Sequence, residues 1–451
     1  TPSVILQSNV AGARAGTSVA VAGDINGDGN VDILVGAPNV SGGLGNQGAA
    51  YVYLNQGGSF AATPSVTFNG GQANALFGTF VAGLNDVNGD GFADIGVGGP
   101  GFTDAAVANS GTVRVYHGSA SFNPTTPSFT KTGGDQPGRF GAAMTSADVN
   151  GDGFSDLFVG APDYTVDQTT EGAAFLYLGS AQGLDPVPNA RIESNQVGAR
   201  LGGSIASAGD LNDDGAADII VGVTDFDDAA VDQGAGFVYL GTRGGAFNST
   251  VDLVLEGATT ATARSGYSVA SGDINGDGVA DLLMGVINED PPGVTDAGAV
   301  RIYPANLSGQ LQARSANYSG APGVAIDAWG VSNVGNGFVV NGTAFSVRGR
   351  ERTKLEVEAC PAGQPFGGGN CIVEAGVDWR QILPTGTALT TVVLVPEGMY
   401  HWRARNLYLP SVAGTGDVTL VEAGPWRRRL GGADVIDVRV TDNLFRNGFE
   451  N

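Results

Sequence analysis

The stretch Asp24-Ile-Asn-Gly-Asp-Gly-Asn-Val-Asp32 is the first of five nine-residue acidic loops in this chain of 451 residues. The other four loops begin at Asp86, Asp148, Asp210 and Asp273, so successive loops start 62, 62, 62 and 63 residues apart. A fixed period of this length is typical of chains built from repeated supersecondary units. The sequence therefore predicts a repeat architecture in which every unit contributes one acidic loop.

Each loop places oxygen atoms where they can surround one cation. Positions 1, 3, 5 and 9 offer side-chain oxygens, position 7 offers a backbone carbonyl, and a glycine at position 6 permits the sharp turn. Ca²⁺ accepts roughly six to eight oxygens in flexible geometry, whereas Mg²⁺ requires a stricter octahedron. We therefore expect about five structural Ca²⁺ ions, each joining two strands of its unit. The predicted metal-binding residues are Asp24, Asn26, Asp28, Asn30, Asp32, Asp86, Asn88, Asp90, Phe92, Asp94, Asp148, Asn150, Asp152, Phe154, Asp156, Asp210, Asn212, Asp214, Ala216, Asp218, Asp273, Asn275, Asp277, Val279 and Asp281.

An EF-hand does not fit these loops. The twelfth position of an EF-hand loop is Glu. The residues at that position here are Val35, Val97, Val159, Val221 and Met284. Each loop also continues directly into an apolar, strand-like segment. The alternative is an Asp- and Gly-rich turn that binds no metal, and five copies with the same oxygens argue against it.

The net negative charge of the chain is confined to the repeats. Residues 1–310 hold 9 Lys and Arg against 32 Asp and Glu, which leaves −23, whereas residues 311–451 hold 13 of each. Without bound cations, the clustered carboxylates would repel one another and destabilise the compact state. This balance excludes nucleic acid as a partner, because nucleic acid requires a basic surface. No apolar run is long enough to predict a transmembrane segment.

Each repeat divides into four short apolar segments bounded by Gly, Pro and Asn turns. One segment precedes the acidic loop, a second follows it, a third carries one tyrosine, and a fourth closes the unit. Four short strands per repeat predict an all-β fold, a β-propeller of four-stranded blades. The tyrosines are expected to pack between blades and not to stack on a ligand. They are Tyr53, Tyr116, Tyr177, Tyr239 and Tyr303.

The frame around the loops resembles a known family. Phe-Gly precedes the loop at Phe77-Gly78 and Phe140-Gly141, and Gly-Ala-Pro follows it at Gly36-Ala-Pro38 and Gly160-Ala-Pro162. Together with the acidic loop, this frame resembles the FG-GAP repeat of integrin α-subunit propellers and of many bacterial secreted proteins. The resemblance covers about residues 1–310. It implies a calcium-binding propeller located outside the cell or on its surface.

The number of blades departs from the family, which usually closes seven. Five repeats are complete, and residues 319–335 are either a linker or a degenerate repeat. The N-terminal segment 3–7 aligns with the fourth strand of other units, and residues 310–318 could supply the same strand to the fifth unit. Two candidates for one position would leave a spare strand, which could pair with another molecule by strand addition.

The C-terminal region, residues 336–451, is expected to form a small β-sandwich. Strand-like segments occur at 353–359, 389–395 and 400–405, and the stretch 396–405 resembles fibronectin type III-like modules. Cys360 and Cys371 lie eleven residues apart in a Pro- and Gly-rich stretch, which favours a disulfide and an oxidising compartment. Residues 444–450 resemble a short tail found on secreted proteins of some Gram-negative bacteria.

The basic run Arg427, Arg428 and Arg429 has two interpretations: a solvated loop, or a contact with the acidic propeller of a neighbouring molecule. The partners expected for the chain are a cell-surface or matrix protein, a glycan, or copies of itself.

The residues give little support for catalysis. His117 and His401 lie in different predicted domains, and no nucleophile elbow, zinc spacing or phosphate loop is present. The sequence therefore favours a non-enzymatic, secreted structural or adhesive protein with the propeller at 1–318, and self-assembly into an extracellular polymer is one form of that role. The alternative is a monomeric propeller that binds carbohydrate or protein, lectin-like or integrin-like. The repeats contain no Trp, since the first is Trp329, which lowers the lectin interpretation.

Overall fold

The repeats form antiparallel sheets whose strands follow the predicted segments. The computed structural model describes residues 4–212, 216–258, 260–272, 274, 280–289, 297–304, 316–318, 331–332, 337–344, 352–361, 369–377, 380–381, 387–396, 398–409, 422–423 and 438–440. In these ranges the secondary structure is β-strand, with turns and bridges between the strands. Within them, no helix is long and apolar enough to cross a membrane.

Four repeats each form a four-stranded meander, and the fifth contributes three described strands. Blade 1 contains β1 (Ser18–Gly23), β2 (Asp32–Ala37), β3 (Ala49–Tyr53) and β4 (Val66–Asn69). Blade 2 contains β5 (Phe80–Asn85), β6 (Asp94–Gly99), β7 (Thr112–Tyr116) and β8 (Phe129–Thr132). Blade 3 contains β9 (Ala143–Ala147), β10 (Asp156–Ala161), β11 (Ala173–Tyr177) and β12 (Ala190–Glu193). Blade 4 contains β13 (Leu201–Gly209), β14 (Asp218–Val223), β15 (Ala235–Tyr239) and β16 (Leu253–Glu256). Blade 5 contains β17 (Ser265–Gly272), β18 (Asp281–Val286) and β19 (Ala299–Tyr303).

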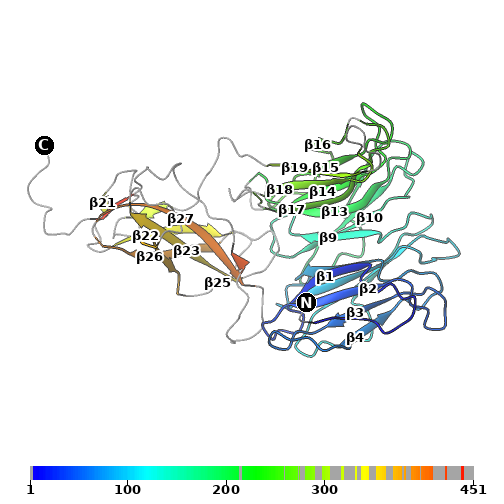
Figure 1. Cartoon of the computed structure of the whole chain (residues 1–451), viewed down its shortest axis with the longest axis horizontal. Helices are drawn as coiled ribbons and strands as arrows, with labels where there is room; N and C mark the ends of the chain where they lie inside the picture. The colour runs from blue at the N-terminus through cyan, green and yellow to red at the C-terminus, as the bar shows by residue number, and fades with distance from the viewer. Residues whose placement is uncertain are drawn as a thin grey trace, which may run out of the picture.

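The blades pack face to face in chain order. The first strands of consecutive blades lie side by side, β1 with β5, β5 with β9, β9 with β13 and β13 with β17 (Figure 1). The second strands, β6 and β10 for example, are buried along their whole length because a neighbouring blade covers each face. Each pair of neighbouring blades buries an apolar cluster between its two members, and the β-propeller prediction is confirmed.

Tyr116 and Tyr177 pack between blades, as predicted, whereas Tyr53 of the first blade packs against its own blade and Leu6. Tyr116 of β7 stacks on Phe68 of β4, with ring centroids 3.9 Å apart. Tyr177 of β11 meets Phe129 of β8 edge to face at 5.5 Å. Both pairs join a blade to the preceding one, and both tyrosines are at most 3% exposed. Aromatic pairs of this kind contribute about 0.5–1.5 kcal/mol beyond the area they bury.

The two candidate closing strands behave differently from the prediction. Residues 4–10 form no strand, and Leu6 instead packs on the outer face of blade 1 beside Tyr51 and Tyr53. Residues 316–318, which the sequence placed at the end of the propeller, form β20 (Ala316–Tyr318) and pair with β22 (Gly337–Ala344). Residues 305–315 lie outside the described ranges. A strand-forming sequence does not by itself specify which sheet edge it reaches, and this explains both differences.

The C-terminal region contains two sheets around one apolar core. One sheet has the order β20-β22-β26, and the other has β21-β29-β27-β23-β24 with β25 and β28 at its side. The remaining strands are β21 (Val331–Ser332), β23 (Arg352–Pro361), β24 (Ile372–Ala375), β25 (Arg380–Gln381), β26 (Thr387–Leu394), β27 (Gly398–Leu409), β28 (Glu422–Ala423) and β29 (Val438–Val440). Val340 and Val393 from the first sheet pack with Val357 and Tyr400 from the second, which is the arrangement of a β-sandwich.

Candidate metal-binding loops

Each acidic loop connects the first and second strands of its blade, and its end carboxylates are buried. Asp24 is 2% exposed and Asp32 is 0% exposed. The Asp24 carboxylate accepts hydrogen bonds from the amides of Gly27 at 2.8 Å and Gly29 at 2.9 Å. The Asp32 carboxylate accepts one from Ile25 at 3.1 Å and one from Asn55 at 2.8 Å. The first aspartate thus shapes the loop, and the last one ties it to the turn that follows β3.

The same bonds recur in the other loops. The backbone amide at loop position 2 donates a hydrogen bond to the carboxylate at position 9, at distances of 2.6–2.9 Å. These pairs are Val87 with Asp94, Val149 with Asp156, Leu211 with Asp218, and Ile274 with Asp281. Glycines after the third strand donate to the other oxygen of that carboxylate. These pairs are Gly118 with Asp94, Gly179 with Asp156, and Gly241 with Asp218.

The residues at positions 3 and 5 lie at the outer side of the loop. Asp28 and Asp90 are exposed, and Asp152 is half-buried. In the first loop, Asn26 Oδ1 accepts the Asp28 amide at 3.0 Å, and Asp28 Oδ1 accepts the Asn30 amide at 2.9 Å. These bonds hold the outer oxygens close to the buried carboxylates, so that one loop presents side-chain oxygens from several of its odd positions.

The buried carboxylates of the first three loops have no cationic side chain to balance them. Within the described residues, no Lys or Arg forms an ion pair with these loops. Burial, with like charge adding to it, raises the pKa of Asp32 and of Asp148 to about 7. Burial also raises the pKa of Asp94 and Asp156 well above the usual value. A buried carboxylate is stable only when it is paired, protonated or bound to a metal. The all-oxygen donor set fits a hard divalent cation such as Ca²⁺.

The loops also connect each blade to the next one, which the sequence interpretation did not foresee. The carbonyl of the first aspartate accepts the amide at position 8 of the following loop. These pairs are Asp24 with Ala93 at 3.0 Å, Asp86 with Ser155 at 3.0 Å, and Asp148 with Ala217 at 2.8 Å. The carbonyl at position 2 accepts an amide from the turn after the third strand of the next blade, as Ile25 does from Ser119 at 2.9 Å. A change in the shape of one loop therefore reaches the neighbouring blade.

One histidine lies against a loop. Nδ1 of His117 is 3.1 Å from Nδ2 of Asn88, at position 3 of the second loop. Burial lowers the pKa of His117, which favours the neutral ring, so Nδ1 accepts and Asn88 donates. The Asn88 amide nitrogen then donates to His117 and also to Asp90 Oδ2 at 2.9 Å, and the Asn88 side-chain oxygen accepts the Asp90 amide at 3.1 Å. His117 is therefore a positioning residue for the loop.

Part of the predicted set falls outside the described residues. Asp214, Asp273, Asn275, Asp277, Val279, Arg427, Arg428 and Arg429 lie there. In the fourth loop, Asp210, Asn212, Ala216 and Asp218 are described, and Asp218 is fully buried. In the fifth loop, Asp281 is described and is 1% exposed.

A chain of charges at the other end of the blades was also missed. Asp163 contacts Arg139 and Arg200, at 3.7 and 3.6 Å. Asp225 contacts Arg200 and Arg264, at 3.6 and 3.0 Å. Each of these arginines immediately precedes the Phe position of its repeat, which is occupied by Phe140, Leu201 and Ser265 in turn. An arginine that recurs at one repeat position was therefore the sequence signal that could have predicted these ion pairs.

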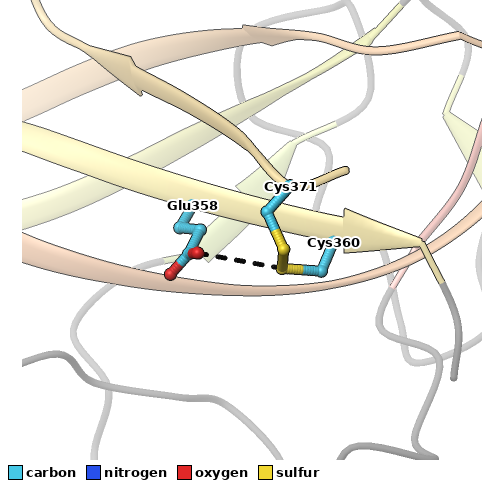
Figure 2. Close-up of a disulfide and its surroundings, with 3 residues drawn as sticks. All are labelled: Glu358, Cys360 and Cys371. Atoms are coloured by element: carbon cyan, nitrogen blue, oxygen red, sulfur yellow. Dashed lines mark hydrogen bonds between the residues drawn. A yellow bond between two sulfur atoms is a disulfide. The ribbon is translucent and has the colours of Figure 1, made fainter. Parts of the chain in front are cut away.

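The disulfide prediction is confirmed, because Cys360 and Cys371 are bonded (Figure 2). The buried Glu358 carboxylate lies 3.9 Å from the Cys360 sulfur. A bridged sulfur carries no hydrogen and is not a thiolate, so this cluster of Glu358, Cys360 and Cys371 has no thiolate to offer a metal.

Comparisons with known proteins agree on the repeat region. The family model described as FG-GAP repeat matches residues 15–53, 140–177 and 265–303. Integrin alpha-5 of Xenopus laevis is 32% identical over 50% of this chain and 21% of its own length. Integrin alpha-7 of Rattus norvegicus is 39% identical over 36% of this chain and 14% of its own. The chain thus spans about a fifth or less of these curated relatives.

Two similar proteins carry enzyme names. Phosphatidylinositol-glycan-specific phospholipase D of Homo sapiens is 36% identical over 33% of this chain and 18% of its own length. A fructofuranosidase structure from Schwanniomyces occidentalis, complexed with fructose, covers 88% of both chains with a TM-score of 0.32 and 6% identity. That structural likeness is too low to inform on function.

Proposed function

The repeat region is an integrin-like FG-GAP propeller, and we propose that this protein is a non-enzymatic, calcium-stabilised structural or adhesive protein of the cell exterior. One observation supports this proposal above the others. Three loops each bury two carboxylates with no Lys or Arg partner among the described residues, and the backbone of the same loops joins neighbouring blades. Ca²⁺ in the loops would neutralise these carboxylates and stabilise the contacts between blades.

The role of each residue follows from its place in the loop. The carboxylates at positions 1 and 9 would supply the buried charge, and positions 3 and 5 would supply oxygens from the solvent side. Position 7 would contribute its backbone carbonyl. Such an ion would stabilise the folded scaffold, with the blade surface left for contacts with a protein or glycan partner.

The exterior location has two supports. The Cys360–Cys371 disulfide suits an oxidising compartment. Calcium sites built from short loops also suit the high calcium concentration outside cells. The C-terminal sandwich is proposed to be a fibronectin type III-like spacer that holds the propeller away from its attachment point.

The test is thermal unfolding of the full chain in calcium, in magnesium and in chelator. Chelation should lower the melting temperature by more than ~10 °C, because ligands that bind only the folded state stabilise it in proportion to their occupancy. Asp94→Asn should reproduce part of this loss in saturating calcium. Asp135→Asn, an exposed acid outside the loops, is the matched control and should leave the melt unchanged. A melt that does not respond to chelator would remove calcium from the proposal.

A further inference from the structure

The four joints between blades share one construction, which we call the clasp. In each clasp, the amide at the Phe position of one blade donates to a carbonyl of the blade before it, at 2.8–3.1 Å. The pairs are Phe77 with Gln47, Phe140 with Ser110, Leu201 with Glu171, and Ser265 with Gln233. The Gly carbonyl that follows sits over a glycine of the preceding blade, where an added Cβ would come within 2.0–2.1 Å of it. These receiving glycines are Gly36, Gly98, Gly160 and Gly222.

Blade 1 carries the donor half of a clasp with nothing joined to it. Gly16 has φ +90°, and its equivalents Gly78, Gly141, Gly202 and Gly266 have φ between +80° and +93°. Those four glycines are buried, whereas Ala15 and Gly16 are exposed. Within the described part of the chain, the Ala15 amide has no hydrogen-bond acceptor.

Strand β1, which follows this donor half in the sequence, also has apolar side chains that no other described blade covers. Val19 of β1 is 66% exposed, although the residues in the same register of blades 2 to 4 are 2–6% exposed. Those residues are Val81, Met144 and Ile205. Val21, two residues on, is 68% exposed. The β1 part of the face that would meet a preceding blade is therefore apolar and open, whereas the part around Tyr51 and Tyr53 is covered by the N-terminal segment that carries Leu6.

Blade 5 carries the receiving half. Gly285 keeps the position of the four receiving glycines, and its nearest neighbour is the hydroxyl of Ser268. Gly298 has φ +70°, close to the +72° to +87° of Gly48, Gly111, Gly172 and Gly234, which lie beside the carbonyls that accept the clasp bonds. Blade 5 thus retains the backbone that receives a following blade.

The face beside this receiving half is open as well. Val300 and Ile302 of β19 are 67% and 52% exposed. The residues equivalent to Ile302 in the other blades are at most 1% exposed, because the next blade covers them. These residues are Val52, Val115, Leu176 and Val238. Exposed apolar faces of this kind mark interaction surfaces.

We infer that blade 1 of one molecule packs on blade 5 of a second copy and forms a fifth clasp that adds chains head to tail. Both halves are present, and in the ranges that the structure describes neither is joined to another blade. The partner face is specified by four examples of the same joint in this molecule. An interface between two different faces of identical chains is heterologous, so it propagates into a filament unless it closes into a ring. This inference rests on the structural role proposed above.

The calcium-loop end of the new joint must differ from the internal joints. Gly118, Gly179 and Gly241 lie close to a carbonyl of the preceding blade, and an added Cβ would come within 2.7–2.8 Å of that oxygen. Blade 1 has Asn55 at this position, with its side chain bonded to the Val31 carbonyl of its own blade. The joint between copies would therefore use the clasp and the strand face, and it would be weaker than the joints within a chain.

The test measures particle mass by sedimentation velocity for the full chain in millimolar calcium, with negative-stain images. Wild type should grow in mass with concentration and form rows of propellers. Val19→Asp blocks the donor face and Ile302→Asp blocks the receiving face, so each variant alone should remain a monomer. A mixture of the two variants should form dimers and no larger particles. The Val19→Asp chain keeps an intact receiving face and the Ile302→Asp chain keeps an intact donor face, so only one joint can form. Leu253→Asp, an exposed apolar position on β16, is the control and should assemble like wild type.

The melting temperature of each variant is measured to show that the substitution has not unfolded the chain. If either aspartate lowers the melt, Val19→Thr and Ile302→Thr replace them. A monomeric wild type in calcium at every concentration would overturn the head-to-tail inference, as would a variant mixture that fails to dimerise. A monomer whose melt still depends on calcium would leave the proposed function standing. A melt indifferent to chelator would instead refute the proposed function, whatever the particle mass.

Discussion

Gly160→Ala tests whether the clasp glycines hold the blades together by close approach. A Cβ added at Gly160 would lie 2.0 Å from the Gly202 carbonyl oxygen and 2.9 Å from the carbon of the same carbonyl. Ordinary contact between these atoms needs more than ~3 Å, so the backbone of blade 4 would have to move by about 1 Å. Overpacking a tight interior costs about 1–3 kcal/mol. The upper end applies here, because the obstacle is backbone and cannot rotate away.

The assay is calorimetric unfolding in saturating calcium. About 3 kcal/mol corresponds to a fall of roughly 6–12 °C in melting temperature for a domain of this size. Gly285→Ala, measured at a protein concentration at which the chain is monomeric, is the matched control, because it changes the same repeat position in blade 5. Its nearest neighbour is the hydroxyl of Ser268, a side chain that can turn aside. The control should cost less than ~1 kcal/mol. Equal losses for the two variants, or no loss for Gly160→Ala, would refute the reasoning.

Three further predictions concern charge. In chelator, the melting temperature should fall as pH rises from about 5 to about 8. The pKa of Asp32 and of Asp148 is about 7 in the folded chain, so the folded state favours the protonated acids and loses that stabilisation as they ionise. Calcium should abolish this pH dependence. His117→Phe removes one of the two acceptors of the Asn88 amide, the other being Asp90 Oδ2, so calorimetric titration should show one calcium ion bound more weakly, by up to roughly tenfold, while the others are unchanged. Asp225→Asn weakens contacts from a buried carboxylate to two half-exposed arginines, and a melting temperature lower by more than ~4 °C would contradict the small contribution expected when one partner of each pair is open to solvent.

The periodic features of the chain were the ones that sequence could predict. An acidic loop at a fixed period determines where the first strand ends and the second begins, and β2 begins at Asp32 and β6 at Asp94, the last residues of their loops. One tyrosine per repeat predicted a buried inter-blade ring, and Tyr177, which packs on Phe129 of the preceding blade, is 1% exposed. Both signals are local and recur, so each copy supports the interpretation of the others.

Features that depend on the neighbouring blade were not predictable in the same way. The bond from Ala93 to the Asp24 carbonyl involves two backbone groups, so no side chain in the sequence announces it. The N-terminal segment has strand-like composition, yet Leu6 lies flat against blade 1. Its outcome depends on which apolar surface is in reach, and propensity does not contain that information.

The two ends of the blades are fastened by different chemistry. At the loop end, buried carboxylates such as Asp94 create a negative charge that only a cation or protons can balance, so cohesion there depends on the solution. At the clasp end, cohesion comes from shape, since the Gly202 carbonyl fits over Gly160 and the Arg200–Asp225 contact adds charge attraction beside it. The clasp end does not need an ion, so it can specify the order and spacing of the blades in any medium. Calcium would then control how rigid the stack is and not which blade meets which, and this division would suit the extracellular scaffold role proposed above.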